Sequence, residues 1–217
     1  MQSADCGDGN DTIYINPYNR SGGVSNAQAL REGRIRGCET VIEQAPEADP
    51  TRGISWSGSG TKHGTDRNDK LLGGHESDQI YGLAGDDVLW ADSRHDSGGS
   101  AAKRQKDFVS GDAGDDTIYG GRGRNTLLGG DGNDFIQGND VSTAVSAGNG
   151  NDNIRVTSGG TSKVDAGAGD DVVSAIIGRG SARIACGPGN DTVIVSRFKS
   201  NRKRTKVAGD CEHRQTG

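Results

Sequence analysis

A nine-residue period runs through the chain and constrains its fold more than any other feature. The repeat reads GTDRNDKLL at 64–72, GGHESDQIY at 73–81 and GLAGDDVLW at 82–90, and it resumes over 111–155 after an interruption. It returns at 166–174 and 186–194, and an isolated copy, CGDGNDTIY, occupies 6–14. The shared template is G-G-x-G-x-D-x-U-x, where U is apolar. A fixed period predicts a repeat architecture in which each unit stacks on its neighbours.

The composition leaves room for only a thin apolar core. Hydrophobic residues make up 30% of the chain and aromatic residues 4%, while Gly accounts for 37 of 217 residues. Burial of such a small apolar area does not offset the conformational entropy that the backbone loses on folding. Another interaction must therefore stabilise the fold. The sequence contains no apolar run of about 18 residues, so it predicts no membrane-spanning helix. Residues 1–30 contain no basic-then-apolar leader, so any secretion signal is expected to be absent or already removed.

The residue types at the fixed positions suit a hard cation. Glycines at positions 1, 2 and 4 permit positive φ angles and let backbone carbonyls approach an ion. Asp at position 6 adds a carboxylate, and Ca²⁺ takes about six to eight oxygen ligands. The x-U-x tail is a short strand whose middle side chain points inward.

These repeats resemble the RTX, or haemolysin-type calcium-binding, family over roughly 64–194. The resemblance implies an all-β fold, a parallel β-roll (β-solenoid) in which two nonapeptides make one coil. It also implies that Ca²⁺ lies between one turn and the next turn on the same edge, about 18 residues later.

Two edges of such a roll differ in their position-6 residues. Alternate repeats, which form the first edge, all have Asp at this position: Asp69, Asp87, Asp116, Asp134, Asp152, Asp171 and Asp191. The second edge has Asp78 and Asp107, then Asn125, Thr143, Ser162 and Ala182. The apolar position 8 is kept on both edges. The resemblance therefore predicts about six Ca²⁺ along the first edge and allows one or two more near Asp78 and Asp107.

Glycines at position 4 of the first edge are expected to support these sites. They are Gly85, Gly114, Gly132, Gly150, Gly169 and Gly189. Arg67 and Glu76 replace the position-4 glycine in the first two turns, so weaker or distorted sites are expected there.

The alternative is that the Asp and Asn residues simply favour turns. Turn chemistry would not restrict Asp to alternate repeats, nor explain carboxylates stacked about 5 Å apart. Like charges at that distance repel, so the metal-free ladder should be unstable. Six Ca²⁺ would change the formal charge from −5 to about +7, which predicts folding coupled to ion binding. Affinity is expected in the roughly 10⁻⁴–10⁻³ M range of extracellular modules.

The four cysteines occur in two matched settings. Cys6 and Cys186 each open a repeat and are each followed by a basic insertion and a second cysteine. Of the three possible pairings, these contexts favour Cys6–Cys38 and Cys186–Cys211. The rival Cys₄ zinc site is less favoured because no C-x₂₋₄-C pair exists. Disulfides imply an oxidising compartment, so a secreted, extracellular protein is predicted. Members of the resembled family that use a dedicated one-step export route generally lack cysteine, so the two disulfides favour a removed leader and oxidative folding outside the cell over that route.

The repeats, the cysteines and the composition together predict the domain organisation. We expect a partial repeat plus cap, the end of a preceding roll, at 1–42, a linker at 43–62, the roll at 63–194, and a C-terminal cap with a basic loop at 195–217. The complete expectation is a parallel β-roll with calcium-binding turns, disulfide-tied caps and irregular loops. The chain is expected to be a monomer or a segment of a larger protein.

The sequence predicts a non-catalytic role, because no nucleophile elbow, zinc-protease or phosphate-loop motif is present. The predicted function is a calcium-binding module with a scaffold role. The alternative is an adhesin or glycan-binding solenoid that holds an anionic glycan or cell surface through the basic segment 197–206 or the loop 91–106. Nucleic acid is not favoured, because only Phe198 could stack on bases in the basic segment.

Overall fold

A computed structural model describes residues 4–7, 12–15, 20–21, 24–25, 32, 34–38, 40–43, 51–92, 105–138, 141–157 and 160–217. The chain divides into two compact units, Met1–Pro50 and Thr51–Gly217. Each unit is described separately below.

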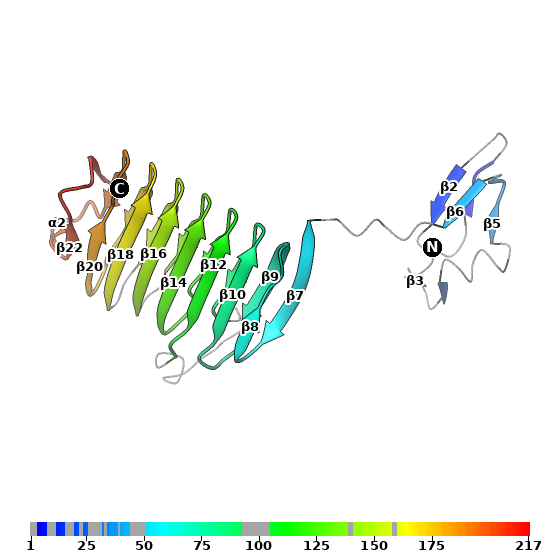
Figure 1. Ribbon diagram of the computed structural model, residues 1–217, viewed down its shortest axis with the longest axis horizontal. Coiled ribbons are helices and arrows are strands. Elements are labelled where there is room, and N and C mark those ends of the chain that lie inside the picture. The colour runs from blue at the N-terminus through cyan, green and yellow to red at the C-terminus, as the bar shows by residue number, and fades with distance from the viewer. Residues whose placement is uncertain are drawn as a thin grey trace. The chain divides into compact units, whose positions relative to one another are not determined.

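The second unit is a parallel β-solenoid built from two facing sheets (Figure 1). The eight-stranded sheet contains β8 (Thr61–His63), β10 (Gln79–Ala84), β12 (Phe108–Ala113), β14 (Arg124–Asp131), β16 (Ser142–Asn149), β18 (Thr161–Ala168), β20 (Ser181–Ala185) and β22 (Thr205–Val207). The nine-stranded sheet contains β7 (Arg52–Gly58), β9 (Asn68–Gly73), β11 (Val88–Trp90), β13 (Thr117–Tyr119), β15 (Phe135–Gln137), β17 (Asn153–Val156), β19 (Val172–Ala175), β21 (Thr192–Val195) and β23 (His213–Thr216). The predicted fold class is confirmed.

The chain alternates between the two sheets, so that two nonapeptides make one coil. Leu127 pairs with Val145 in one sheet, and Ile136 pairs with Ile154 in the other. Each step advances the chain by one coil and places one position-8 residue beside the next. Where the sequence is interrupted, Ile80 still pairs with Val109, so the insertion leaves the coil register unchanged. Residues 93–104 of this insertion lie outside the described residues.

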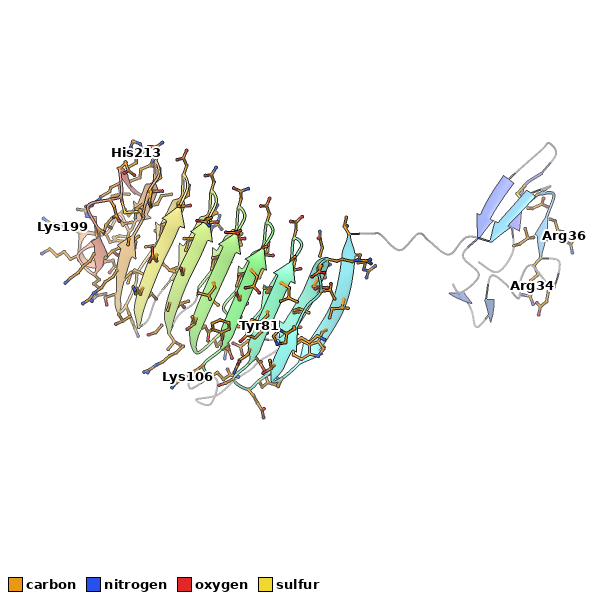
Figure 2. The ribbon with its side chains drawn as sticks, in the orientation of Figure 1. Arg34, Arg36, Tyr81, Lys106, Lys199 and His213 are labelled. Carbon is orange, nitrogen blue, oxygen red and sulfur yellow. A yellow bond between two sulfur atoms is a disulfide. The ribbon has the colours of Figure 1, made fainter. Side chains whose placement is uncertain are left out.

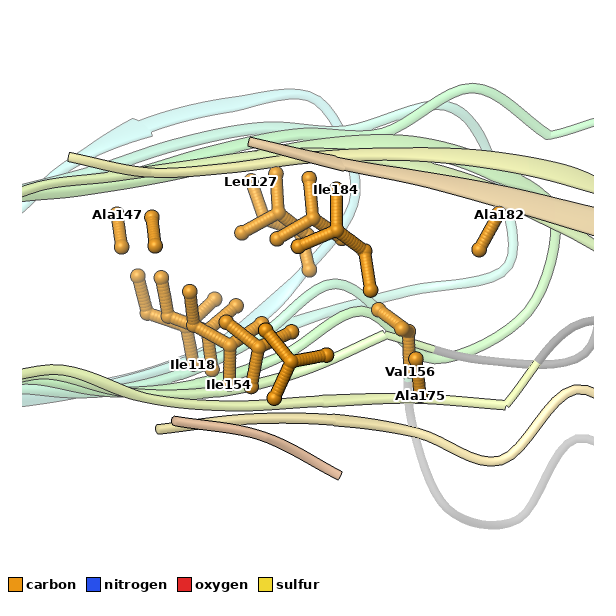
Figure 3. Packing of buried hydrophobic residues seen from close by; sticks show 14 of the residues in the cluster. Ile118, Leu127, Ala147, Ile154, Val156, Ala175, Ala182 and Ile184 are labelled. Atoms are coloured by element: carbon orange, nitrogen blue, oxygen red, sulfur yellow. The ribbon is translucent and has the colours of Figure 1, made fainter. Parts of the chain in front are cut away.

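The core is a narrow column of apolar side chains between the sheets. Position-8 residues from both sheets face each other and are almost fully buried, as Figure 3 shows for Ile118, Leu127 and Ile154. Burying one such side chain contributes roughly 1.5–3 kcal/mol. Each coil supplies only two of them, together with small residues such as Ala147, so the core remains as thin as the composition predicts.

Aromatic side chains stack along the outer faces of both sheets. Trp90 and Tyr119 lie with ring centroids 4.1 Å apart, and His63 and Tyr81 lie 4.6 Å apart. These rings pack against one another from strand to strand, so neighbouring rings cover their faces. These pairs stabilise the stacking of coils, at about 0.5–1.5 kcal/mol each.

The solenoid begins earlier than the sequence-based boundary at residue 63. Strands β7 and β8 lie within the segment expected to be a linker, and the second compact unit starts at Thr51. In β7, Ile54 and Trp56 alternate with polar residues and pack against the core. This period-2 pattern was hidden by the Ser and Gly residues around it. At the other end, β22 and β23 extend both sheets through the segment expected to be a cap.

The apolar column ends in a charged residue at the C-terminal end. Arg214 occupies the position of Val193 in the preceding coil, and its guanidinium donates to the carbonyl oxygens of Val207 and Ala208. Helix α2 (Lys199–Arg202) precedes β22. No helix within the described ranges is long and apolar enough to span a membrane.

The first unit resembles the last coil of the second. Strand β2 (Thr12–Ile15) pairs in parallel with β6 (Thr40–Glu43), and β1 (Ala4–Asp5) pairs in parallel with β5 (Ile35–Arg36). The short strands β3 (Arg20–Ser21) and β4 (Val24–Ser25) pair antiparallel.

Both predicted disulfides are present, Cys6–Cys38 and Cys186–Cys211. Strand β2 starts after Cys6 at the same spacing as β21 starts after Cys186. Strand β6 starts after Cys38 at the same spacing as β23 starts after Cys211.

Candidate metal centre

The aspartates of the first edge form a continuous hydrogen-bonded ladder inside the turns. The backbone N–H of each residue donates to Oδ1 of the aspartate one coil later, as from Asp69 to Asp87 at 2.7 Å and from Asp134 to Asp152 at 2.8 Å. The same bond joins every neighbouring pair from Asp69 to Asp191. The alternate aspartates that the sequence singled out therefore lie directly above one another.

The second carboxylate oxygen of most ladder residues is buried and has no hydrogen-bond partner. The orphaned atoms on this edge are Oδ2 of Asp87, Asp116, Asp134, Asp152, Asp171 and Asp191. Their side chains are at most 2% exposed. A buried charged oxygen without a hydrogen-bond partner is costly, so a cation would stabilise the ionised form of each of these carboxyls.

A second oxygen lies beside the orphaned atoms of Asp87, Asp116 and Asp134. A Cβ built on Gly111 would lie against Oδ2 of Asp116 and within 2.7 Å of the carbonyl oxygen of Gly129 in the next coil. The same juxtaposition recurs at Gly82 and Gly129. At these three glycines a carboxylate oxygen and a carbonyl oxygen of the next coil therefore approach the same point. The equivalent position in the turns of Asp152, Asp171 and Asp191 is held by Ala147, Ala166 and Cys186. Oxygen donors without competing N–H groups are what Ca²⁺ requires.

Burial sets the protonation of these carboxyls in the metal-free protein. It raises the pKa of Asp116 to about 8 and that of Asp87 and Asp152 to about 7, against the opposing effect of the backbone hydrogen bond. The pKa values of Asp134 and Asp171 rise to about 6 for the same reason. Neighbouring ladder carboxylates raise the pKa of Asp116 further.

The position-4 glycines allow the turns to stack closely. Gly132 has φ +136°, and a Cβ on it would meet the carbonyl oxygen of Gly114 in the preceding turn. The equivalent glycines Gly85, Gly150, Gly169 and Gly189 also have positive φ. A side chain at these positions would therefore separate adjacent turns.

A second ladder runs along the outside of the same turns at position 5. Backbone N–H groups donate to side-chain oxygens one coil away, as from Asn133 to Asp115 at 2.7 Å and from Asn151 to Asn133 at 2.9 Å. Oxygen-tipped side chains project from successive turns at this edge in Figure 2. The acidic and amide residues at position 5 thus link neighbouring turns through exposed hydrogen bonds.

Glu212 and His213 terminate the two ladders, and sequence reasoning missed both. The N–H of Asp191 donates to Oε2 of Glu212 at 2.9 Å, and the imidazole of His213 contacts Oδ1 of Asn190 at 3.0 Å. The last turn is too short for a nonapeptide, so its repeat position could not be read from spacing. The only signal was the Cys-Glu pair shared by residues 38–39 and 211–212.

Asp69 and Asp78 differ from the other predicted ligands because both of their carboxylate oxygens accept hydrogen bonds. Asp69 accepts from the N–H groups of Ile54 and Thr65. Asp78 accepts from the N–H of Gly60 at 2.5 Å and of Gly74 at 2.8 Å. These first two turns are satisfied by the protein itself.

The second edge shows how a turn closes without an ion. Nδ2 of Asn125 donates to the carbonyl oxygens of Gly120 and Arg122 in its own turn. One coil later, a Cβ on Gly138 would contact the buried side chain of Thr143. Neutral side chains therefore provide the donor or fill the space that the aspartate turns leave open. Asp107 is the exception on this edge, because its Oδ2 is buried without a partner.

No three acidic, histidine or cysteine side chains converge as a metal cluster within the described ranges. A cation held by one carboxylate in such a turn would need further oxygen ligands, and backbone carbonyl oxygens lie beside the carboxylates of Asp87, Asp116 and Asp134. The geometry of stacked glycine-rich turns, each with one carboxylate, provides such ligands.

The comparison with family models agrees with this geometry. The model of the RTX calcium-binding nonapeptide repeat matches four copies, over residues 63–97 and 105–136. The chain carries RTX repeats. The repeats of this family bind Ca²⁺. The same strand register and Asp ladder extend beyond the matched residues to Asp191. Searches of curated proteins and of solved structures found no match.

Asp134 offers a test of the RTX ligand position. In Asp134→Asn, the amide should donate to the turn carbonyls as Asn125 does, so the fold should persist with one fewer bound ion. Asp134→Ala should be less stable than Asp134→Asn, by about 1–3 kcal/mol, because the N–H of Asp116 loses its acceptor. Denaturant titration in Ca²⁺ with parallel ion counting measures both effects. An unchanged ion count in Asp134→Asn would contradict the assignment.

Proposed function

We propose that residues 51–217 are an extracellular calcium-binding module whose folding is coupled to Ca²⁺ binding, with a scaffold role and no catalytic activity. The observation that carries the proposal is the row of six buried, partnerless carboxylate oxygens on one edge. In this proposal the position-6 aspartates Asp87, Asp116, Asp134, Asp152, Asp171 and Asp191 are the carboxylate ligands, and turn carbonyls complete each site.

The proposed number of ions is about six on the first edge, one for each orphaned oxygen, and one on the second edge at Asp107. Asp69 and Asp78 are left out of the strong sites because the protein already satisfies them. The two disulfides support the extracellular location, because such bonds persist in oxidising compartments.

The first unit is proposed to be a second copy of the terminal coil and its cap. The support is the matched pairing of β2 with β6 and of β21 with β23, each next to an equivalent disulfide. In the second unit the terminal coil stacks on earlier coils. We therefore propose that the first unit is the end of a preceding roll, as its sequence suggests.

A calcium titration followed by calorimetry tests the main proposal. We expect about seven ions per chain with affinities of roughly 10⁻⁴–10⁻³ M, and a binding heat that includes the heat of folding. Circular dichroism recorded at the same calcium concentrations should change in parallel. A chain that binds no Ca²⁺ in this range would refute the proposal.

A second candidate function is the binding of an acidic glycan by the basic cap. Six basic residues fall within 197–206, and none of them forms an ion pair with the described residues. A cavity of about 210 Å³ beside them is lined partly by Arg202, Thr205 and Arg214. Binding of a sulfated or uronic-acid glycan that is lost in Arg202→Ala would support this function. Most of the alternative loop 91–106 lies outside the described residues.

A further inference from the structure

Among the described residues, the second edge contains one turn that the insertion splits in two. It is formed by Ala91 and Asp92 on one side of the insertion and by Gln105, Lys106 and Asp107 on the other. Lys106, labelled in Figure 2, belongs to this turn. The N–H of Lys106 donates to Oγ of Ser77 at 3.0 Å, so this half of the turn stacks on the preceding one.

Two residues of this split turn depart from the repeat pattern in a way that adds oxygen donors. Asp92 stands at position 2, where the next turn has Gly121, and Gln105 stands at position 4, where the next turn has Gly123. Both side chains are buried, with Asp92 4% and Gln105 6% exposed. The next turn of this edge, with Gly121 and Gly123, has no side chain at these positions.

The neighbouring turns hold these side chains in place. Oδ2 of Asp92 accepts from the N–H of Arg122 at 2.5 Å, and Nε2 of Gln105 donates to the carbonyl oxygen of Glu76 at 3.5 Å. With its amide nitrogen bound in this way, Gln105 leaves Oε1 buried and without a partner. Asp92 and Gln105 are thus fixed between the turns before and after them.

Asp107 contributes a third buried oxygen. Its side chain is 2% exposed, and Oδ2 has no hydrogen-bond partner. Two carboxylates and an amide oxygen in one desolvated turn favour a divalent cation with hard oxygen preference.

The two neighbouring turns of the second edge do not offer comparable oxygen ligands. Upstream, both oxygens of Asp78 accept backbone N–H groups. Downstream, Nδ2 of Asn125 already donates to the carbonyl oxygens of its turn. The oxygen-rich turn is therefore isolated between two satisfied turns.

We propose that Asp92, Gln105 and Asp107 together bind one Ca²⁺ on the second edge, separate from the ladder of the first edge. The inference rests on the proposed calcium-binding function, but two of its three side-chain ligands lie outside the nonapeptide motif. The proposal assigns Asp92 and Gln105 as side-chain ligands in place of the backbone ligands that an uninterrupted turn would provide.

Terbium luminescence reports ions near Trp90, which lies two residues from Asp92 on the second edge and three residues from Asp87 on the first edge. With Tb³⁺ in place of Ca²⁺ and tryptophan excitation, wild-type protein should show sensitised emission that Trp90→Phe largely removes. Asp92→Asn and Asp107→Asn should each lose one bound ion per chain and the part of this emission that comes from the second edge. Asp107→Asn is expected to fold, because Asn125 occupies the same position in the next turn.

Matched variants separate the site from general charge effects. Glu76→Gln removes the same charge from an exposed position on the neighbouring turn of this edge and should leave the emission and ion count unchanged. Gln105→Leu, which changes no charge, should weaken the Trp90-sensitised emission without altering the circular dichroism in Ca²⁺. A wild-type chain that binds no ions overturns both this inference and the proposed function. Full ion counts in Asp92→Asn and Gln105→Leu overturn this inference alone.

Discussion

Removal of Ca²⁺ by EDTA at neutral pH should abolish most of the strand signal of residues 51–217 in circular dichroism, and added Ca²⁺ should restore it. Each site stabilises the fold by RT ln(1 + [Ca²⁺]/Kd), about 1.4–2.7 kcal/mol when free Ca²⁺ exceeds Kd about ten- to hundredfold. Six such sites would contribute about 8–16 kcal/mol. That equals the whole free energy of unfolding of a typical domain, about 5–15 kcal/mol, so the thin core should not hold the coils alone.

The ion specificity provides the control for this experiment. Mg²⁺ prefers an octahedral site and gives up its water reluctantly, so it should restore the signal poorly at the same concentration. EDTA already saturated with Ca²⁺ should have no effect. Identical spectra and melting temperatures with Ca²⁺ and with EDTA would contradict calcium-coupled folding.

The repeat pattern predicted the ladder because each of its elements is local in sequence. The spacing of Asp116, Asp134 and Asp152 determines which residues stack once two nonapeptides form a coil, and the backbone then brings them into hydrogen-bonding register. The disulfide partners followed from repeated local contexts in the same way. These features need no information about distant segments.

The features that the sequence did not reveal depend on contacts between segments. Asp69 and Asp78 carry the ligand residue type, but Ile54 and Gly60 satisfy them. Those donors come from strand β7 and the turn after it, which the composition assigned to a linker. Likewise, residue type alone indicated that Asn125 had lost the ligand function. In the structure its amide group donates to two carbonyl oxygens of its own turn. Residue type alone does not show which oxygens remain unsatisfied.

The stability of the metal-free protein should fall as pH rises from about 4 to about 8, which is the second large effect that we expect. Five ladder carboxyls have folded-state pKa values of about 6 to 8, above the unfolded value of about 3.9: Asp87, Asp116, Asp134, Asp152 and Asp171. The folded state therefore binds more protons than the unfolded state in this range. The stabilisation is fully present below the unfolded pKa and is lost as pH rises through the folded values.

Calcium should reverse the direction of this dependence. Because Ca²⁺ binds the ionised carboxylates, its apparent affinity should increase with pH, and the calcium-loaded protein should become more stable where the metal-free protein unfolds. Each carboxyl that keeps its proton only in the folded state changes the free energy of unfolding by about 1.4 kcal/mol per pH unit. Thermal melts at several pH values, with EDTA and with Ca²⁺, should give curves that cross. Metal-free protein that gains stability between about pH 5 and about pH 8 would show that the ladder carboxyls are ionised and satisfied without an ion.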